Sequence, residues 1–280
     1  MSSELAAVLL GLTSAAFWGA GDFGGGLATK RNNVFGVIII SQLIGAVFLV
    51  GLALILNEAL PTLADMLLGA LAGLFGAAGL VALYSGLASG RMGVVAPVAA
   101  VVSAAVPVMA GLFFEGLPAA VQLVGFLLAL GAVWLLSDPG HGQKLRLGEL
   151  GLPVAAGLGF GLFFILIDRV SDSAVLWPLV GARLASITMV FTISLLLRRL
   201  AAPAVKQLPL IALAGLLDSG GNTFFALAAR AGRLDIAAIL ASLYPAMTVL
   251  LAWLILGERL SRRQWLGLVI ALVAVIFIAA

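Results

Sequence analysis

The sequence predicts an all-α polytopic membrane protein with ten transmembrane helices, arranged as two inverted five-helix repeats. Three observations predict this fold class: the composition, ten apolar segments of membrane-spanning length, and a match of the chain to itself. Of the 280 residues, 63% are hydrophobic and 10% are charged, and the mean hydropathy is +1.24. A soluble domain carries about 25% charged residues and could not bury this much apolar surface in one core.

The same composition excludes several functional classes. The chain has no cysteine, which excludes a disulfide-stapled secreted scaffold, and its low charge excludes intrinsic disorder. The formal net charge is +3, but the 15 Lys and Arg residues are dispersed, so no nucleic-acid-binding face is expected. No positively charged segment precedes the first apolar stretch, which we therefore expect to be a retained span rather than a signal peptide.

Ten apolar segments are long enough to cross a bilayer, because about 20 helical residues cover about 30 Å of hydrocarbon. Charged and turn-forming residues separate the segments. The expected spans are residues 5–28, 34–56, 64–87, 93–114, 119–137, 149–168, 175–197, 207–229, 235–256 and 263–279. They are too long and too uniformly apolar for the strands of a membrane β-barrel. Pro245, inside the ninth segment, removes a helix hydrogen bond and should kink that span.

The positive charges of the loops predict an orientation. Eleven of the 15 Lys and Arg residues lie in loops that follow odd-numbered spans, three lie in the other loops, and Arg183 lies within a span. The positive-inside rule then places the odd-numbered loops in the cytoplasm and both termini outside.

The chain matches itself at an offset of 142 residues. The aligned pairs include Gly19 and Gly161, Gly79 and Gly221, Gly90-Arg91 and Gly232-Arg233, Gln122 and Gln264, and Gly125 and Gly267. Five spans per repeat is an odd number, so the second half enters the bilayer in the opposite direction, as in many secondary transporters. We expect a first repeat over residues 1–137, a polar linker over 138–147 and a second repeat over 148–280. A duplicated membrane structural protein or enzyme is the alternative.

Both halves also end alike, with an apolar helix, a glutamate at the turn and a closing helix that begins with glutamine and glycine. The residues are Phe113-Phe114-Glu115-Gly116-Leu117 with Gln122 and Gly125, and Leu256-Gly257-Glu258-Arg259-Leu260 with Gln264 and Gly267. Together with Phe17-Trp18-Gly19 and Ser242-Leu243-Tyr244-Pro245, they give a chain that resembles, over its whole length, the EamA-type transporters of the drug/metabolite transporter superfamily. The resemblance implies a ten-helix carrier, in many relatives an exporter of amino acids or other small metabolites. It also implies cytoplasmic termini, opposite to the loop charges, so the orientation stays open.

Three charged residues lie inside the predicted spans, namely Asp22, Arg183 and Asp218. A charge at mid-membrane costs roughly 2.5–3.5 kcal/mol on insertion scales, so each is a candidate functional residue. At the rise of a helix, Asp22 would lie about 12 Å, Asp218 about 18 Å and Arg183 about 22 Å from the cytoplasmic loops. The similar depth of Arg183 and Asp218 on adjacent spans predicts that they pair in a central cavity. A purely structural ion pair is the alternative.

Further polar and aromatic side chains are expected around this cavity. Asn222 shares a helix face with Asp218, and Trp18 shares one with Asp22, each at a spacing of four residues. Tyr84, Gln42 and Tyr244 lie at comparable depths, with simple packing or an interhelical hydrogen bond as the alternative role. The candidate substrate-binding residues are Trp18, Asp22, Gln42, Tyr84, Arg183, Asp218, Asn222 and Tyr244. Aromatic groups with a few polar anchors suit a small amphiphilic ligand.

These observations predict a secondary transporter that moves a small amphiphilic metabolite by alternating access, with export implied by the resemblance. With both aspartates ionised, Asp22, Asp218 and Arg183 sum to a charge of −1, which favours a cationic or zwitterionic substrate such as an amino acid. Asp22 or Asp218 could also carry a proton. No cofactor or metal is expected, because cysteine is absent and the one histidine lies in the central loop. The expected form is a monomer or homodimer in the bacterial cytoplasmic (inner) membrane.

An intramembrane aspartyl protease is the alternative class. Gly19-Ala20-Gly21-Asp22 fits the GxGD string of those enzymes, and Asp218 would be the second carboxyl group. The Tyr-Asp and Pro-Ala-Leu strings of that family are absent, and GxGD arises easily by chance among 34 glycines. The transporter is therefore favoured.

Overall fold

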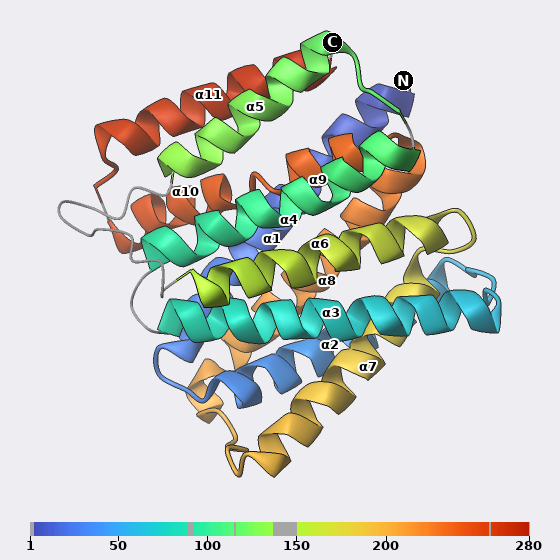
Figure 1. The fold of residues 1–280 in the computed structure, drawn as a ribbon. Helices are drawn as coiled ribbons and strands as arrows, with labels where there is room; N and C mark the ends of the chain where they lie inside the picture. Colours follow the sequence, from blue (N-terminus) through green and yellow to red (C-terminus); the bar gives the residue numbers. More distant parts are fainter. Residues whose placement is uncertain (1–2, 89–91, 115, 137–149, 258, 280) are drawn as a thin grey trace.

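A computed structural model describes residues 3–88, 92–114, 116–136, 150–257 and 259–279. Within these ranges every regular element is a helix (Figure 1). Eight helical stretches are long and apolar enough to cross a membrane, and Val98–Phe114 and Ala120–Leu136 are two shorter apolar helices. The prediction of an all-α membrane protein with ten spans is confirmed. The predicted linker, residues 138–147, lies outside the described residues.

The helices follow the predicted spans closely. The first repeat contains α1 (Ser3–Thr29), α2 (Val34–Ile55), α3 (Leu63–Ala88), α4 (Met92–Phe114) and α5 (Ala120–Leu136). The second contains α6 (Gly151–Ser171), α7 (Leu176–Leu196), the short 3-10 helix η2 (Val205–Gln207), α8 (Leu208–Ala231), α9 (Leu234–Ala241), α10 (Tyr244–Leu256) and α11 (Arg262–Ala279).

Polar side chains in the loops define where two of the helices begin. The side-chain oxygen of Asn33 accepts hydrogen bonds from the backbone N–H groups of Phe35 and Gly36, and this caps α2. The carboxylate of Glu58, in the loop between α2 and α3, accepts the N–H groups of Leu176 and Trp177 at 2.9 Å each. A loop of the first repeat thus caps α7 of the second.

The ninth span is broken, where the sequence predicted one kinked helix over residues 235–256. Helix α9 ends at Ala241 and α10 begins at Tyr244. Pro245 is in the first turn of α10, where its missing N–H group leaves no helix hydrogen bond unmade. At the break, the N–H of Leu243 bonds to the carbonyl oxygen of Leu240 at 3.1 Å, three residues back instead of four. The proline therefore separates two helices.

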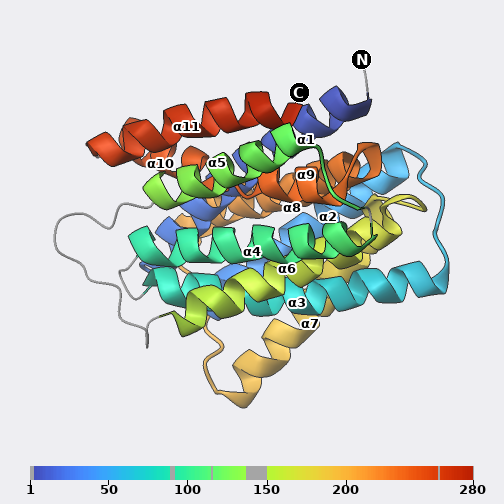
Figure 2. The same ribbon diagram turned by 45° about the horizontal axis from the view of Figure 1, so that its top comes forward.

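The two repeats interlock, and their contacts are related by an approximate twofold axis. Helix α1 packs on α8 as α6 packs on α3, and α1 packs on α9 and α10 as α6 packs on α4. In three further contacts, a helix packs on its own counterpart from the other repeat, namely α2 on α7, α4 on α9, and α5 on α11. Figures 1 and 2 show α5 and α11 side by side, and both termini at the same end of the bundle. Helix α6 begins at the opposite end from α1 (Figure 1), as inverted repeats require.

The outer surface of the bundle is apolar. Large hydrophobic side chains such as Val47, Phe113 and Leu272 are more than two-thirds exposed. A soluble protein does not carry this much exposed apolar surface, whereas the hydrocarbon of a bilayer solvates it. The bundle is therefore built to be surrounded by lipid, with its polar groups inside.

Candidate functional site

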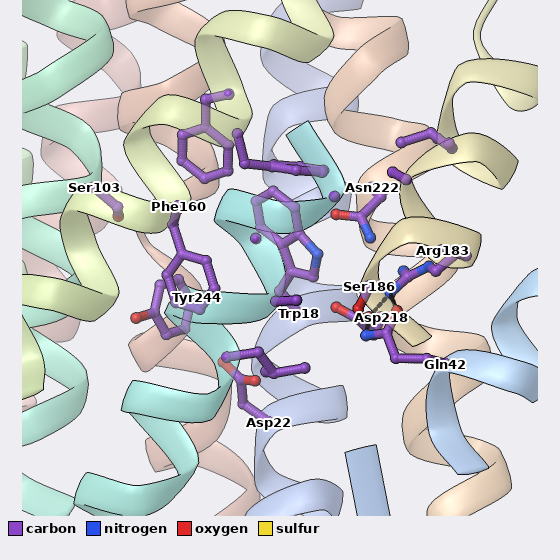
Figure 3. A pocket seen from close by; sticks show the side chains of 18 residues that line it. Trp18, Asp22, Gln42, Ser103, Phe160, Arg183, Ser186, Asp218, Asn222 and Tyr244 are labelled. Atoms are coloured by element: carbon purple, nitrogen blue, oxygen red, sulfur yellow. Dashed lines mark hydrogen bonds and ion pairs between the residues drawn. The ribbon is translucent and has the colours of Figure 1, made fainter. Parts of the chain in front are cut away.

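A cavity lies between helices of both repeats (Figure 3), and the empty space within it and at its mouth amounts to about 680 Å³. Its lining residues are Trp18, Asp22, Gln42, Gly73, Gly76, Ala77, Leu80, Ser103, Phe160, Phe163, Phe164, Leu179, Ala182, Arg183, Ser186, Asp218, Asn222 and Tyr244. They come from α1, α2, α3, α4, α6, α7, α8 and the first residue of α10. Seven of the eight residues predicted from the sequence are among them, and Tyr84 is not.

Arg183, Asp218 and Gln42 form a polar cluster at one side of the cavity. Nη1 of Arg183 donates to Oδ2 of Asp218 at 2.6 Å and to Oε1 of Gln42 at 2.5 Å. Gln42 in turn donates through Nε2 to Oδ2 of Asp218 at 3.5 Å. The three side chains come from α7, α8 and α2, so the cluster joins both repeats. The predicted pairing of Arg183 with Asp218 is confirmed.

Burial makes this cluster energetically important. Only 6% of Arg183 is exposed, while 27% of the Asp218 side chain remains accessible. A guanidinium inside a membrane protein needs an anionic or carbonyl partner, because its desolvation is expensive. Asp218 supplies the charge, and Gln42 accepts a second hydrogen bond. The accessible part of Asp218 faces the cavity.

Asp22 lies in α1, apart from the Arg183 cluster (Figure 3). Its carboxylate makes no hydrogen bond or ion pair with the described residues. An aspartyl protease needs two carboxyl groups that share a proton. Asp218 is bound to Arg183 instead, so the arrangement gives no support to the protease alternative. Asp22 is a carboxyl group of the cavity lining that a ligand in the cavity can reach.

Aromatic side chains form much of the remaining lining. Trp18 stacks on Phe164 with ring centroids 5.3 Å apart and on Phe225 at 5.7 Å, and Phe164 stacks on Phe225 at 4.4 Å. Trp18 also packs closely against Gly221 of α8, where a methyl group would lie 2.5 Å from Cδ1 of Trp18. Phe225 is fully buried and absent from the lining, whereas Trp18 and Phe164 offer flat apolar faces to a ligand.

The two predicted tyrosines have different positions. Tyr244, at the start of α10, lines the cavity (Figure 3). Tyr84 is 5% exposed and packs away from the lining, with its hydroxyl group against Gly25 of α1. Depth in the span alone could not separate the two, because each lies at a comparable level in its own helix.

Sequence reasoning missed the apolar side of the cavity. The 142-residue offset could have found it, because four missed lining residues are repeat counterparts of predicted ones. Phe160 corresponds to Trp18, Phe164 to Asp22, Gly76 to Asp218 and Leu80 to Asn222. The packing of an aromatic ring against a glycine is also repeated between the two halves. A methyl group at Gly79 of α3 would lie 2.8 Å from Cδ1 of Phe160 of α6, just as a methyl group at Gly221 of α8 would crowd Trp18 of α1.

Comparison with known proteins assigns this fold and cavity to a family. The EamA-like transporter family matches the chain twice, over residues 5–138 and 147–280. The chain belongs to the EamA-like transporter family. It is therefore a multi-pass membrane transporter, with a lipid bilayer as its surroundings and a small molecule as its cargo. The family match gives no support to a protease.

The EamA-like fold is also found in a solved crystal structure of low sequence similarity. That structure matches with a TM-score of 0.80 at 15% identity, and the match covers 97% of this chain and 97% of the other. At this identity the likeness shows the fold alone. No curated protein is similar enough in sequence to match this EamA-like chain.

Proposed function

We propose that this EamA-like transporter moves a small amphiphilic metabolite, cationic or zwitterionic, through the central cavity by alternating access. The observation that carries the proposal is the cavity itself. It lies between the two repeats and combines Asp22, Asp218 and Arg183 with a wall of aromatic side chains. Few polar anchors among apolar groups are the usual lining of a small-molecule site. An amino acid has the required chemistry.

Charge favours a substrate with a positive group. Arg183 and Asp218 neutralise one another through their 2.6 Å contact. Asp22 is then a carboxyl group of the cavity lining with no cationic partner among the described residues, and an ammonium group would provide one. A free anion would meet a site of net charge −1. Asp22 is also our candidate carrier if a proton is transported together with the substrate.

The interlocked repeats support alternating access. The main helix contacts of the first repeat have counterparts in the second, such as α1 with α8 and α6 with α3. If the two repeats exchange conformations, the outward-open and inward-open states are related by the same twofold symmetry. We propose that the direction is export across the bacterial cytoplasmic membrane and that the transporter is a monomer or homodimer.

Transport by the purified protein in liposomes tests the proposal. We expect a labelled zwitterionic amino acid or a cationic amine to enter faster than into protein-free liposomes, and a dicarboxylate to enter at the background rate. An imposed pH gradient should change the rate if a proton is co-transported and leave it unchanged otherwise. Uptake of the dicarboxylate alone, or of none of the three classes, would contradict the proposal.

Two further measurements address Asp22 and the direction. Asp22→Asn should reduce uptake of the cationic or zwitterionic substrate at least ten-fold, while Glu4→Gln, a change of an exposed residue in the same helix, should not. Uptake into inside-out vesicles from expressing cells, without uptake into right-side-out vesicles, would indicate export.

A further inference from the structure

Two polar groups of the cavity lining have no hydrogen-bond partner in the part of the chain that the structure describes. Nη2 of Arg183 and Oγ of Ser186 are both buried and unpartnered, although Nη1 of the same arginine makes two hydrogen bonds. Arg183 is 6% exposed and Ser186 is 3% exposed. A buried donor without an acceptor is destabilising, so few are retained in a folded protein without a reason. Both groups line the cavity, where a ligand could supply the acceptor.

The two groups point to one position. Arg183 and Ser186 are three residues apart in α7, and residues at this spacing are neighbours on one helix face. Figure 3 shows them beside one another at the same side of the cavity. Ser219 has a third unpartnered hydroxyl group, but it packs against Gly45 of α2 and does not line the cavity. The two unpartnered donors that belong to lining residues therefore lie on the same face of α7.

We propose that Nη2 of Arg183 and Oγ of Ser186 form an oxyanion subsite that binds the carboxylate group of the substrate. A guanidinium donates to carboxylate oxygens through charge-assisted hydrogen bonds, which are the strong ones. Asp218 and Gln42 hold Nη1, so the guanidinium is oriented with Nη2 free for the ligand. The subsite rests on the proposed function and specifies which part of the substrate binds at α7.

The apolar side of the cavity takes the apolar part of the same substrate. Phe160 and Phe164 of α6 are the counterparts of Trp18 and Asp22, and Leu80 of α3 is the counterpart of Asn222. The twofold axis thus relates a polar side of the cavity, with Asp22, Asp218 and Asn222 of α1 and α8, to an apolar side, with Phe164, Gly76 and Leu80 of α6 and α3. A ligand that satisfies both has its carboxylate at α7 and a large apolar group against α6.

The charged residues of the cavity lining indicate that the substrate also carries a positive group. A carboxylate added to the cavity would raise the net negative charge of the lining and ligand from one to two, unless the ligand also carries a positive group. Asp22, whose carboxyl group makes no hydrogen bond or ion pair with the described residues, is available for an ammonium group. The structure therefore favours a zwitterion with a large apolar group over a simple cationic amine and over a small hydrophilic zwitterion such as glycine.

Four probes separate these classes: L-leucine, L-leucinamide, isoamylamine and glycine. Leucinamide lacks the carboxylate, isoamylamine lacks the carboxyl carbon altogether, and glycine lacks the apolar group. In calorimetric titration of the purified transporter, we expect leucine to bind at least ten-fold more tightly than each of the other three. Equal or tighter binding of leucinamide or isoamylamine, or no measurable binding of leucine, would overturn the subsite.

A serine substitution tests the residues. Ser186→Ala should weaken leucine binding roughly ten-fold, the effect of one lost hydrogen bond to a charged group, and leave isoamylamine binding unchanged. Ser194→Ala is the matched control: Ser194 is buried in the same helix, is absent from the lining, and already donates to the carbonyl oxygen of Phe191 at 2.7 Å. Equal effects of the two substitutions would contradict the proposal.

Arg183→Lys provides a second test, because lysine keeps the charge but lacks the second nitrogen. We expect this variant to keep binding isoamylamine while losing the preference for leucine. If amines without a carboxylate are transported as well as leucine by the wild-type protein, the subsite is wrong and the transporter proposal stands. If liposomes take up neither amines nor zwitterions, the transporter proposal itself fails.

Discussion

Arg183 is the residue on which the polar side of the cavity depends. Its guanidinium contacts Asp218 and Gln42 through one nitrogen and leaves the other unpartnered beside Ser186. Removal of one partner of a buried ion pair leaves the other charge uncompensated, whereas removal of both avoids that cost. The pair can therefore be tested by comparing single and double substitutions.

Arg183→Ala should abolish transport and lower the stability of the protein by about 3–5 kcal/mol, because Asp218 loses its partner. The double variant Arg183→Ala with Asp218→Asn should recover much of that stability, since no buried charge is then unpaired. Thermal unfolding in detergent and liposome uptake measure the two effects. Full activity of the single Arg183→Ala variant would refute the role of the pair in transport.

Position 221 requires glycine, because Trp18 packs directly against it. A Cβ atom there would be 2.5 Å from Cδ1 of Trp18, so the indole ring would have to move. Gly221→Ala should cost about 1–3 kcal/mol in stability and reduce substrate uptake, as the displaced ring alters the lining. Gly51→Ala in α2 is the control, because a Cβ atom at Gly51 would contact nothing within 4 Å. Similar melting temperatures for the two variants would contradict this account.

Among the elements, α7 depends most on a neighbour from the other repeat. It carries Arg183 and Ser186, and its first turn has no side-chain cap from its own N-cap residue, Val175. The carboxylate of Glu58 fills this role by accepting the N–H groups of Val175, Leu176 and Trp177. A negative charge at a helix N-terminus is also favoured by the helix dipole.

Glu58→Ala should therefore lower the stability by about 1–2 kcal/mol, the usual effect of a lost helix cap. For a chain of this size, that corresponds to a decrease in melting temperature of roughly 2–8 °C. Glu58→Gln keeps one acceptor oxygen and should have a smaller effect. Glu4→Ala, in the exposed first turn of α1, serves as the control, and an equal loss for all three would argue against the cap.

At the scale of the whole molecule, contacts between the repeats occur at both ends of the bundle. At the end opposite the termini, the backbone N–H of Ala204 donates to Oδ1 of Asn32 at 2.8 Å. At the end with the termini, Nη2 of Arg233 donates to the carbonyl oxygen of Gly116 at 2.8 Å. Alternating access requires contacts of this kind to break at one end while they persist at the other.

A cross-link between Asn32 and Ala204 should stop transport. The chain contains no cysteine, so Asn32→Cys with Ala204→Cys gives a single pair to oxidise. We expect uptake to fall to background after oxidation and to return with reductant, while each single variant stays active under both conditions. Transport by the oxidised pair at the rate of the single variants would show that this end does not open.

The helices and the charged part of the site could be predicted from the sequence. Hydropathy reports the free energy of moving each residue out of water, so ten apolar segments and three costly charges, Asp22, Arg183 and Asp218, are visible without a structure. The depth of Arg183 and Asp218 even predicted their contact. The repeat at 142 residues implied the inverted architecture.

Tertiary packing alone decided the other half of the cavity and the partners of each polar group. Phe160 and Phe164 line the cavity, but in the sequence they look like any apolar residues of a transmembrane helix. Lipid and protein interior are equally apolar, so hydropathy cannot tell a lipid-facing side chain from a cavity-lining one. Gln42 becomes a partner of Arg183, and Tyr84 is left outside the lining, through helix contacts between the repeats. The sequence therefore specifies which residues lie in the membrane and which of them have a high free energy of insertion, and packing specifies which of them come into contact.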